Sequence, residues 1–345
     1  MSEMTSLQRV LTTLGQKEPD RVPLFLLLTM HGAKELDMSI QDYFSSGENV
    51  AEGQLRLRAK YGHDCFYPFF YAAIEVEAWG SDVIYSSDGP PNAGAPIIKK
   101  PADILKLRPP KIEGNAPLTK VLKSIEILKS KGEEVPIVGV VMSPFSLPVM
   151  QMGFEAYLQL MHEHQELFDH LMEMNEEFIV SWANAQLEAG ATAITYFDPV
   201  SSPSIVPRKL FLETGFQIAK RTLARINGPT AVHLASGRVI PIIDDIAQLG
   251  TAIVGTSTLE DLAEVKSACG GRLTALGNLN GIEMCRWTQQ EAEAAVKSAI
   301  DKAGPDGGFI LADNHGEIPF QVSEEILMTI AETVRSYGQY PLKAR

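Results

Sequence analysis

The chain has 345 residues, of which 45% are hydrophobic and 21% are charged. This balance is that of ordinary globular proteins, so the chain can bury a large core and is not of disordered composition. Its formal net charge of −13 excludes broad contact with a phosphate backbone, which needs clustered Lys and Arg, and we expect no nucleic acid partner. The longest apolar run, residues 22–30, is far shorter than the roughly 20 residues that cross a bilayer, so we expect no membrane insertion.

The cysteines and the N-terminal segment indicate a cytoplasmic protein. Cys65, Cys269 and Cys285 are too few and too scattered for a disulfide framework, and no pair has CxxC spacing. Residues 1–21 are typical of a polar helix and lack the apolar core of a signal peptide. We therefore expect a cytoplasmic location with reduced thiols.

Short apolar runs alternate with long amphipathic segments, which is the pattern of parallel strands joined by crossover helices. After the N-terminal helix, the predicted strands are residues 22–29, 65–70, 135–142, 193–197, 230–234, 252–254, 273–276 and 308–312. Their apolar character is continuous rather than alternating, as expected for strands buried on both faces. Helical periodicity is clearest over residues 154–189 and 207–226, where Gly190 and Gly228 supply the stops.

A Pro/Gly/Ser-rich stretch, residues 81–117, separates the second predicted strand from the third. A segment of that length without periodicity commonly covers a site or leaves the main fold. The elements together predict an α/β fold, a (β/α)8 TIM barrel with an N-terminal helical extension and a long insertion after the second strand. Residues 1–345 are predicted to form a single domain of this kind.

Polar and aromatic residues follow the ends of most predicted strands, where barrel enzymes place their catalytic groups. The residues at these ends are Thr29, Met30, His31, Ser143, Pro144, Phe145, Ser146, Tyr196, Phe197, Asp198, His233, Ser236, Thr256, Ser257, Asn278, Asn280, Asp313, Asn314, His315 and Glu317. Two imidazoles with a carboxylate suit either a divalent metal or metal-free acid/base chemistry, so we predict His233, His315 and Asp198 as catalytic residues. We expect His31, Asn278 and Asn280 to contact substrate. Each position also has a structural interpretation, because polar residues that end strands commonly cap the next helix.

Seven strings resemble the uroporphyrinogen decarboxylase superfamily in their order and spacing over nearly the whole chain. They are DRVPLF (20–25), EVEAWG (75–80), SPFSLPVMQMG (143–153), AQLEAGATAITYFDPVSSP (185–203), HLASGR (233–238), GNLNG (277–281) and FILADNHGEIP (309–319). Decarboxylases of this superfamily carry an Arg-rich segment after the first strand that grips the carboxylates of a tetrapyrrole. Here that stretch is LLLTMHGAKEL, without Arg, so the chain more closely resembles the corrinoid-dependent methyltransferases.

The resemblance also bears on metal binding. Methyltransferases of this superfamily that act on coenzyme M bind zinc through His-x-Cys and a later Cys. His233 matches their histidine, Ala235 replaces the first Cys, and His315 lies close to the position of the second. The resemblance therefore implies a possible Zn²⁺ bound by His233, His315 and Glu317, and a substrate that is not a thiol, because thiolate ligands are the ones that suit thiol activation.

The resemblance implies that the chain is a methyltransferase and acts as the first component of an O-demethylase system. It would demethylate a small methylated substrate, such as a methoxylated aromatic compound, and pass the methyl group to the cob(I)alamin of a separate corrinoid-binding protein. His233 and His315, with Asp198, Asp313 or Glu317, would bind zinc or protonate the leaving oxygen, and an apolar pocket would be lined by Met30, Phe145 and Tyr196. Transfer from a methylcorrinoid to a thiol or tetrahydrofolate is the alternative, and the His315–Gly316 pair keeps uroporphyrinogen decarboxylation open.

Overall fold

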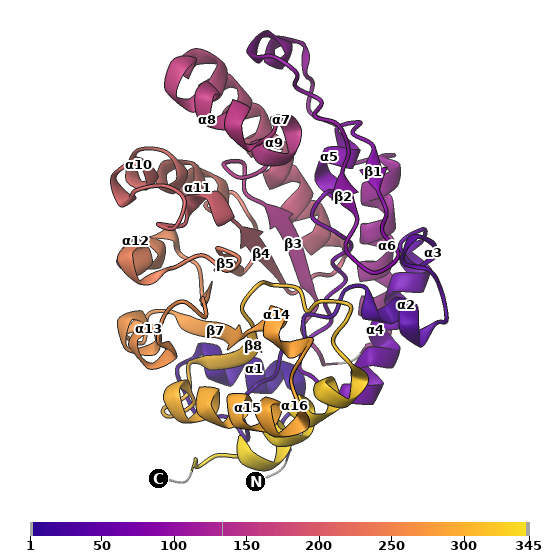
Figure 1. Cartoon of the computed structure of the whole chain (residues 1–345), viewed down its shortest axis with the longest axis vertical. Coiled ribbons are helices and arrows are strands. Elements are labelled where there is room, and N and C mark those ends of the chain that lie inside the picture. The colour runs from indigo at the N-terminus through magenta and orange to yellow at the C-terminus, as the bar shows by residue number, and fades with distance from the viewer. Residues whose placement is uncertain (1–2, 133, 343–345) are drawn as a thin grey trace.

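A computed structural model describes residues 3–342 of the chain, except residue 133. Its main sheet is parallel and has the order β3-β4-β5-β6-β7-β8, so each strand pairs with the next strand along the chain. The strands are β3 (Val138–Met142), β4 (Ala193–Phe197), β5 (Thr230–His233), β6 (Ile253–Gly255), β7 (Thr274–Leu279) and β8 (Phe309–Asp313). Helices follow each strand and lie around the sheet, which is the arrangement of barrel folds (Figure 1).

The first two predicted strands are present only as single bridges. Leu24 pairs with Leu311 of β8, and Phe66 pairs with Ile137 beside β3. The Asp64 amide donates to the Leu24 carbonyl over 2.7 Å, so these two segments also contact each other between β8 and β3. Pro23 and Pro68 interrupt the two segments, and since proline has no amide hydrogen, neither segment can form a full ladder. The described main sheet therefore has six strands, not the eight that the sequence predicted.

Helices surround the sheet in chain order around Figure 1. The longer ones are α4 (Gly47–Tyr61), α6 (Ala116–Ser130), α8 (Phe154–Glu163), α9 (Gln165–Ala189), α11 (Gly215–Leu223), α13 (Leu262–Cys269), α15 (Gln289–Ala303) and α16 (Glu324–Tyr337). The shorter ones are α2 (His31–Glu35), α3 (Ile40–Tyr43), α5 (Ile74–Ala78), α7 (Pro148–Met152), α10 (Arg208–Glu213), α12 (Ile243–Ile246) and α14 (Gly281–Met284), with 3₁₀ turns at Pro101–Lys106, Pro199–Ser201, Ile240–Ile242 and Ala247–Leu249. No helix in the described ranges is long and apolar enough to span a bilayer.

Two helices that the sequence predicted as continuous are each divided. The segment 154–189 breaks at His164, whose φ of −136° and ψ of 59° are not helical, so α8 and α9 are separate. The segment 207–226 breaks in the same way at Thr214, between α10 and α11. Gly190 ends α9 in the left-handed conformation, as predicted from its place after the periodic segment.

The predicted insertion is confirmed as an excursion with little regular structure. Residues 81–117 contain a two-stranded hairpin of β1 (Val83–Ile84) and β2 (Asn92–Ala93), followed by a 3₁₀ turn and the beginning of α6. The Gln321 side chain donates to the Asp88 carbonyl over 2.6 Å, which joins the insertion to the loop after β8. The insertion therefore lies beside a loop that begins at the carboxyl end of a strand.

The N-terminal helix α1 (Ser6–Leu14) lies across the amino-terminal ends of the strands. The Leu7 amide donates to the Glu134 carbonyl, just before β3, over 2.9 Å. The Gln16 side chain donates to the Thr274 hydroxyl, at the start of β7, over 3.2 Å. Val10 faces an apolar cavity inside the sheet, so α1 closes this end of the fold.

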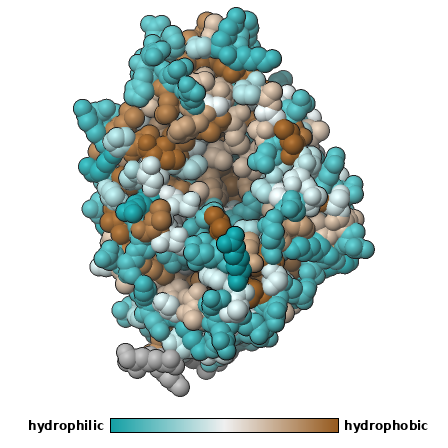
Figure 2. Space-filling model, viewed as in Figure 1, coloured by the Kyte–Doolittle hydropathy of each residue, from teal (hydrophilic) through white to brown (hydrophobic). Residues whose placement is uncertain are grey.

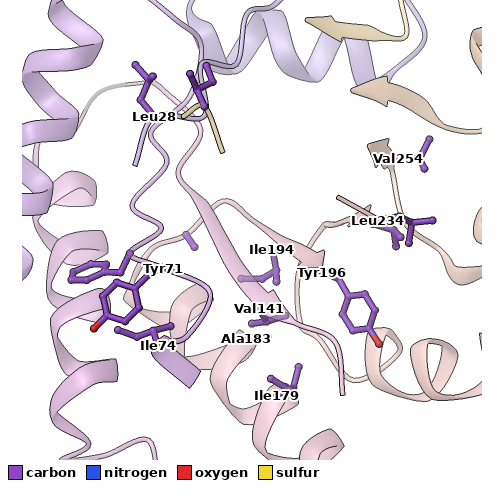
Figure 3. Packing of buried hydrophobic residues seen from close by; sticks show 14 of the residues in the cluster. Leu28, Tyr71, Ile74, Val141, Ile179, Ala183, Ile194, Tyr196, Leu234 and Val254 are labelled. Carbon is purple, nitrogen blue, oxygen red and sulfur yellow. The ribbon is translucent and has the colours of Figure 1, made fainter. Parts of the chain in front are cut away.

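Strand side chains divide into two hydrophobic clusters. The inner cluster fills the space enclosed by the strands and includes Phe25, Leu27, Tyr67, Val138, Val140, Ala231, Ile253, Leu276, Ile310 and Ala312. The outer cluster packs the strands against the surrounding helices, and Figure 3 shows Ile194 and Tyr196 of β4 near Ile179 and Ala183 of α9. Because neighbouring residues of a strand point to opposite faces, Phe197 belongs to the inside and Tyr196 to the outside.

Candidate active site

His233, the last residue of β5, lies at the carboxyl-terminal end of the enclosed space. Its ring stacks on Phe197, the last residue of β4, with centroids 4.7 Å apart and planes 24° apart. Gly255 of β6 leaves room for the imidazole, since a Cβ at that position would lie 2.4 Å from the His233 ring. The ends of three adjacent strands therefore fix the position of this imidazole.

The His233 imidazole is neutral and lacks hydrogen-bond partners. The residue is 1% exposed, and neither ring nitrogen has a partner in the described ranges. Burial lowers the pKa of His233 to about 3, and the nearby His315 adds to this effect. Buried polar atoms normally have partners, and the ring nitrogens of His31 and His63 are unmatched in the same way, so what distinguishes His233 is its place at the end of a strand.

Asp313 ends β8 and is held through one carboxylate oxygen. Its Oδ2 accepts hydrogen bonds from the backbone amides of His315 and Gly316, both over 2.8 Å. Its Oδ1 is buried without a partner in the described ranges. Burial raises the pKa of Asp313, while the two backbone amides and the His315 side chain oppose the shift. His315 itself is partly exposed, and its Nδ1 lies 2.9 Å from Asn314 Oδ1.

Glu317 joins this group from the same loop. The Thr29 hydroxyl donates to the Glu317 carboxylate. Burial raises the pKa of Glu317 to about 7, and the neighbouring Asp313 adds to the shift. Tyr67 closes the other side, where its hydroxyl donates to the Gly316 carbonyl over 2.9 Å. Segments from the first, second and eighth strand positions thus meet around two carboxyl groups whose pKa is raised by burial.

Aromatic side chains form a wall beside the histidine. Phe69 and Phe197 are partly exposed, with nearly parallel rings whose centroids are 6.4 Å apart, and Tyr67 lies 5.8 Å from Phe69. The loop after β8 packs closely on this wall, because a Cβ on Gly316 would lie 2.1 Å from Phe197. Phe69 and Phe197 were not among the predicted site residues, although the position of His233 on the inner face and the two-residue alternation of strands could have indicated Phe197.

The structure places Phe145 and Tyr196 away from this wall, which corrects the prediction that they line a pocket. Both are fully buried in the outer cluster. The Phe145 ring meets the rings of Tyr157 and Phe168 edge-on, at centroid distances of 6.0 and 6.4 Å. Tyr196 lies one residue before Phe197 on β4 and so faces the helices (Figure 3). We therefore assign both side chains to packing.

Asp198 is close in sequence to the site, but its carboxylate is bound to other residues. Its Oδ1 accepts hydrogen bonds from the hydroxyls of Ser143 at 2.6 Å and Ser146 at 2.7 Å. Its backbone amide donates to the His233 carbonyl over 2.8 Å. Burial raises the pKa of Asp198, and the serine hydroxyls oppose the shift. Asp198 therefore connects the loops after β3 and β4 to the end of β5, which positions His233.

Met30 and His31 lie at the start of α2, directly after the first barrel segment. Met30 is fully buried, and the His31 ring packs edge-on against Phe320 of the loop after β8, with centroids 5.9 Å apart. Burial lowers the pKa of His31 to about 3. Lys34, on the exposed side of α2, places its ammonium 4.2 Å from the Phe320 ring centroid. These residues support the loop that carries His315 and Glu317.

Asn278 and Asn280 lie outside the group around His233. The Asn278 side chain donates to the Ser257 carbonyl over 2.9 Å. Asn280 caps α14, since its side chain accepts from the amides of Ile282 and Glu283. Both line a separate cleft of about 680 Å³ between α13, α14 and α15. The structural interpretation of Asn280 is therefore confirmed, and nothing in the described contacts joins either residue to the histidines.

The predicted metal ligands do not form a metal site. Within the described ranges, no three side chains of His, Cys, Asp or Glu are placed to hold one ion. Glu317 is engaged by Thr29, and Asp313 is turned towards backbone amides. At the position after the fifth strand where a thiolate would be needed, Ala235 has no donor atom. The residues present suit proton transfer better than zinc coordination.

The open end of the strands, here called the mouth, leads to this group. It is the end at which His233, Asp313 and the loop after β8 lie, and Figure 2 shows a hollow near the centre of the face viewed. Beneath it, an apolar cavity of about 80 Å³ extends from His233 and Phe197 to α1. His233 and Phe197 line this cavity, and Asp313 ends β8, followed by Glu317, at the same end of the strands.

Comparisons with known proteins agree with this arrangement. The family model of uroporphyrinogen decarboxylase (URO-D) matches residues 5–337. The methylcobamide:CoM methyltransferase MtaA of Methanosarcina barkeri is 26% identical over 90% of this chain and 94% of its own length. A uroporphyrinogen decarboxylase of Magnetococcus marinus is 22% identical over 97% of this chain and 98% of its own. The structure of a methyltransferase from Methanosarcina mazei matches the fold with a TM-score of 0.85 and 21% identity, over 97% of this chain and 99% of that one. The chain therefore belongs to the uroporphyrinogen decarboxylase (URO-D) family.

Proposed function

We propose that this chain transfers a methyl group between a small substrate bound in the mouth and a corrinoid carried by a separate protein. The observation that carries the proposal is the group at the mouth, in which His233, Asp313 and Glu317 combine a neutral imidazole with two carboxyl groups whose pKa is raised by burial. Relatives that are named methylcobamide:CoM methyltransferases align over nearly the whole chain, which supports the proposal. Residues 26–36 contain no Arg to grip a polycarboxylate, which disfavours a tetrapyrrole decarboxylase.

The finer proposal is demethylation of a small ether, such as a methoxylated aromatic compound. The corrinoid, when bound, supplies the nucleophile that takes the methyl group. As the carbon–oxygen bond breaks, its electron pair stays on the oxygen, which then needs a proton. Glu317 can donate this proton near neutral pH because its pKa is raised to about 7, and Asp313 stands beside it. Phe69 and Phe197 would hold the ring of the substrate by stacking.

The reverse direction uses the same residues. Two relatives from Methanosarcina are named methylcobamide:CoM methyltransferases, which favours methyl transfer from the corrinoid to an acceptor. An acceptor such as a thiol or tetrahydrofolate must lose a proton as the new bond forms, and ionised Glu317 can accept it. Neither direction is assigned a step through zinc, because no three described side chains of His, Cys, Asp or Glu are placed to hold one ion.

The test follows the spectrum of free cobalamin in both directions. We expect cob(I)alamin to be consumed when the purified chain is mixed with methoxylated arenes, or methylcobalamin to be consumed with coenzyme M, 2-mercaptoethanol or tetrahydrofolate. Glu317→Gln should lower the rate roughly 100-fold, because a positioned acid contributes about that much or more. Glu283→Gln, an exposed change on α14, should leave the rate within about twofold.

The proposal fails if neither direction proceeds and the same preparation consumes uroporphyrinogen without cobalamin. It also fails in its proton-transfer part if Glu317→Gln and Glu283→Gln behave alike.

A further inference from the structure

The acidic side chains of the mouth lack a basic partner. Asp313 is 1% exposed, its Oδ1 has no hydrogen-bond partner in the described ranges, and its Oδ2 is bound only by backbone amides. Glu317 accepts from the neutral hydroxyl of Thr29. Among the described ion pairs, none includes Asp313 or Glu317, so no Lys or Arg neutralises them.

The cationic side chains of nearby elements have other contacts. Lys34 lies over the Phe320 ring and donates to the Phe320 carbonyl, on the outer side of the loop after β8. Arg208, after the 3₁₀ turn that follows β4, is paired with Asp245. Arg238, after β5, is exposed at the surface. The imidazole of His233 is neutral, so it supplies no positive charge either.

The buried polar atoms of the mouth that lack partners can pair with hydrogen-bond donors as well as with acceptors. The Asp313 Oδ1 can accept a hydrogen bond, and of the two ring nitrogens of neutral His233, one donates and the other accepts. The opposite wall, Phe69 and Phe197, offers only aromatic faces. The group around His233 therefore combines aromatic faces with acidic side chains.

We propose that the mouth selects its substrate by charge: it binds an uncharged aromatic methyl compound that offers a hydrogen-bond donor, and rejects an anion of the same shape. An anion entering here would lose its hydration without gaining a cation, and it would face the carboxyl oxygens of Asp313 and Glu317, which carry its own sign whenever they are ionised. The inference rests on the proposed function, since it describes the substrate of that reaction. It extends to the reverse direction, in which a neutral thiol is accepted in preference to a sulfonated one.

The test measures binding without corrinoid, so it does not depend on turnover. Calorimetric titrations at pH 7.5 compare 2-methoxyphenol, which is neutral and carries a hydroxyl donor, with 2-methoxybenzoate, which is anionic and similar in size. We expect the neutral compound to bind at least tenfold more tightly to the wild-type chain. Glu317→Gln removes one acidic group at the same volume and should reduce the preference to threefold or less. Glu283→Gln should leave the preference within twofold of wild type.

Equal or tighter binding of 2-methoxybenzoate overturns the inference, and so does the absence of binding of either compound up to its solubility limit. An unchanged preference in Glu317→Gln also overturns it. The proposed function is judged separately by the cobalamin spectra. If 2-methoxyphenol is preferred in binding but no methyl transfer occurs in either direction, the methyltransferase proposal fails and the charge selection stands. If 2-methoxybenzoate and coenzyme M are used as fast as their neutral counterparts, the methyltransferase proposal stands and the charge selection fails.

Discussion

Replacing Gly316 by alanine tests how tightly the loop after β8 is fitted to the aromatic wall. Gly316 has a φ of +85°, and a Cβ built on it would lie 2.1 Å from Cζ of Phe197 and 2.7 Å from Cε1. Ordinary carbon contacts are about 3.5–4.0 Å, so the ring or the loop would have to move by roughly 1.4 Å. The Phe197 ring is confined by His233 on one side and Phe69 on the other, at centroid distances of 4.7 and 6.4 Å.

The expected cost of Gly316→Ala has two parts. A left-handed conformation costs alanine about 1–2 kcal/mol relative to glycine. Overpacking against a confined ring adds about 1–3 kcal/mol. Gly114 offers a matched control, because it has a φ of +74° and nothing within 4 Å of its Cβ position. Gly114→Ala should therefore lose only the first part.

Urea unfolding of the two variants measures the difference directly. We expect Gly316→Ala to be less stable than Gly114→Ala by about 1–3 kcal/mol, and to lose methyl transfer as well, because the displaced Phe197 ring stacks on His233. Equal losses of stability in the two variants would refute the close packing of loop and ring. Loss of stability with full activity would show that Phe197 does not position the imidazole.

Two further predictions concern buried carboxyl groups elsewhere. Asp64 is buried between Arg9 and Arg21 at 2.6 and 2.7 Å, so Asp64→Asn should cost about 3–5 kcal/mol in urea unfolding, whereas the exposed ion-pair control Asp244→Asn should cost at most about 1 kcal/mol. Burial alone would raise the pKa of Asp64, but the two arginines lower it overall. The carboxylate of Asp64 therefore stabilises the folded chain above about pH 4, and this stabilisation is lost on acidification. A wild-type advantage over Asp64→Asn that persists at low pH would contradict this. Burial raises the pKa of Glu75 to about 8, so from about pH 5 to 8 the folded chain keeps a proton that the unfolded chain has lost, and wild-type stability should fall with rising pH relative to Glu75→Gln. Parallel pH profiles of these two proteins would count against the raised pKa.

The order and type of the main elements could be predicted from the sequence, because parallel strands buried on both faces leave continuous apolar runs. All six strands of the main sheet coincide with predicted runs. The first two runs are equally apolar but do not form ladders, since Pro23 and Pro68 remove the amide donors that a ladder needs. The helix break at His164 carries no Gly or Pro and leaves no signal in the sequence, whereas the break at Thr214 is followed by Gly215.

The sequence predicted the strand ends at which the candidate site lies, but it did not predict which side chains line the site. The strand ends predicted His233 and His315 as site residues, and His315 contributes to the lowered pKa of His233. Tyr196 rather than Phe197 was predicted to line the pocket, because a continuous apolar strand does not show which residues point inwards. The role of Asp198 as a connector also depends on two serines of another loop, Ser143 and Ser146, whose approach only the folded chain reveals.

The position of α1 constrains the order in which reactants can come and go. This helix covers the amino-terminal ends of the strands from Glu134 to Thr274, and the interior beneath His233 is filled by apolar side chains. In the described part of the chain, the amino-terminal end is therefore closed, which leaves the mouth as the doorway to the imidazole. A bulky cobalamin carrier resting on that doorway would trap whatever lies inside, so the small reactant must arrive before the carrier and its product must wait for the carrier to depart. Steady-state kinetics of the full system should accordingly follow a compulsory sequence rather than a random one.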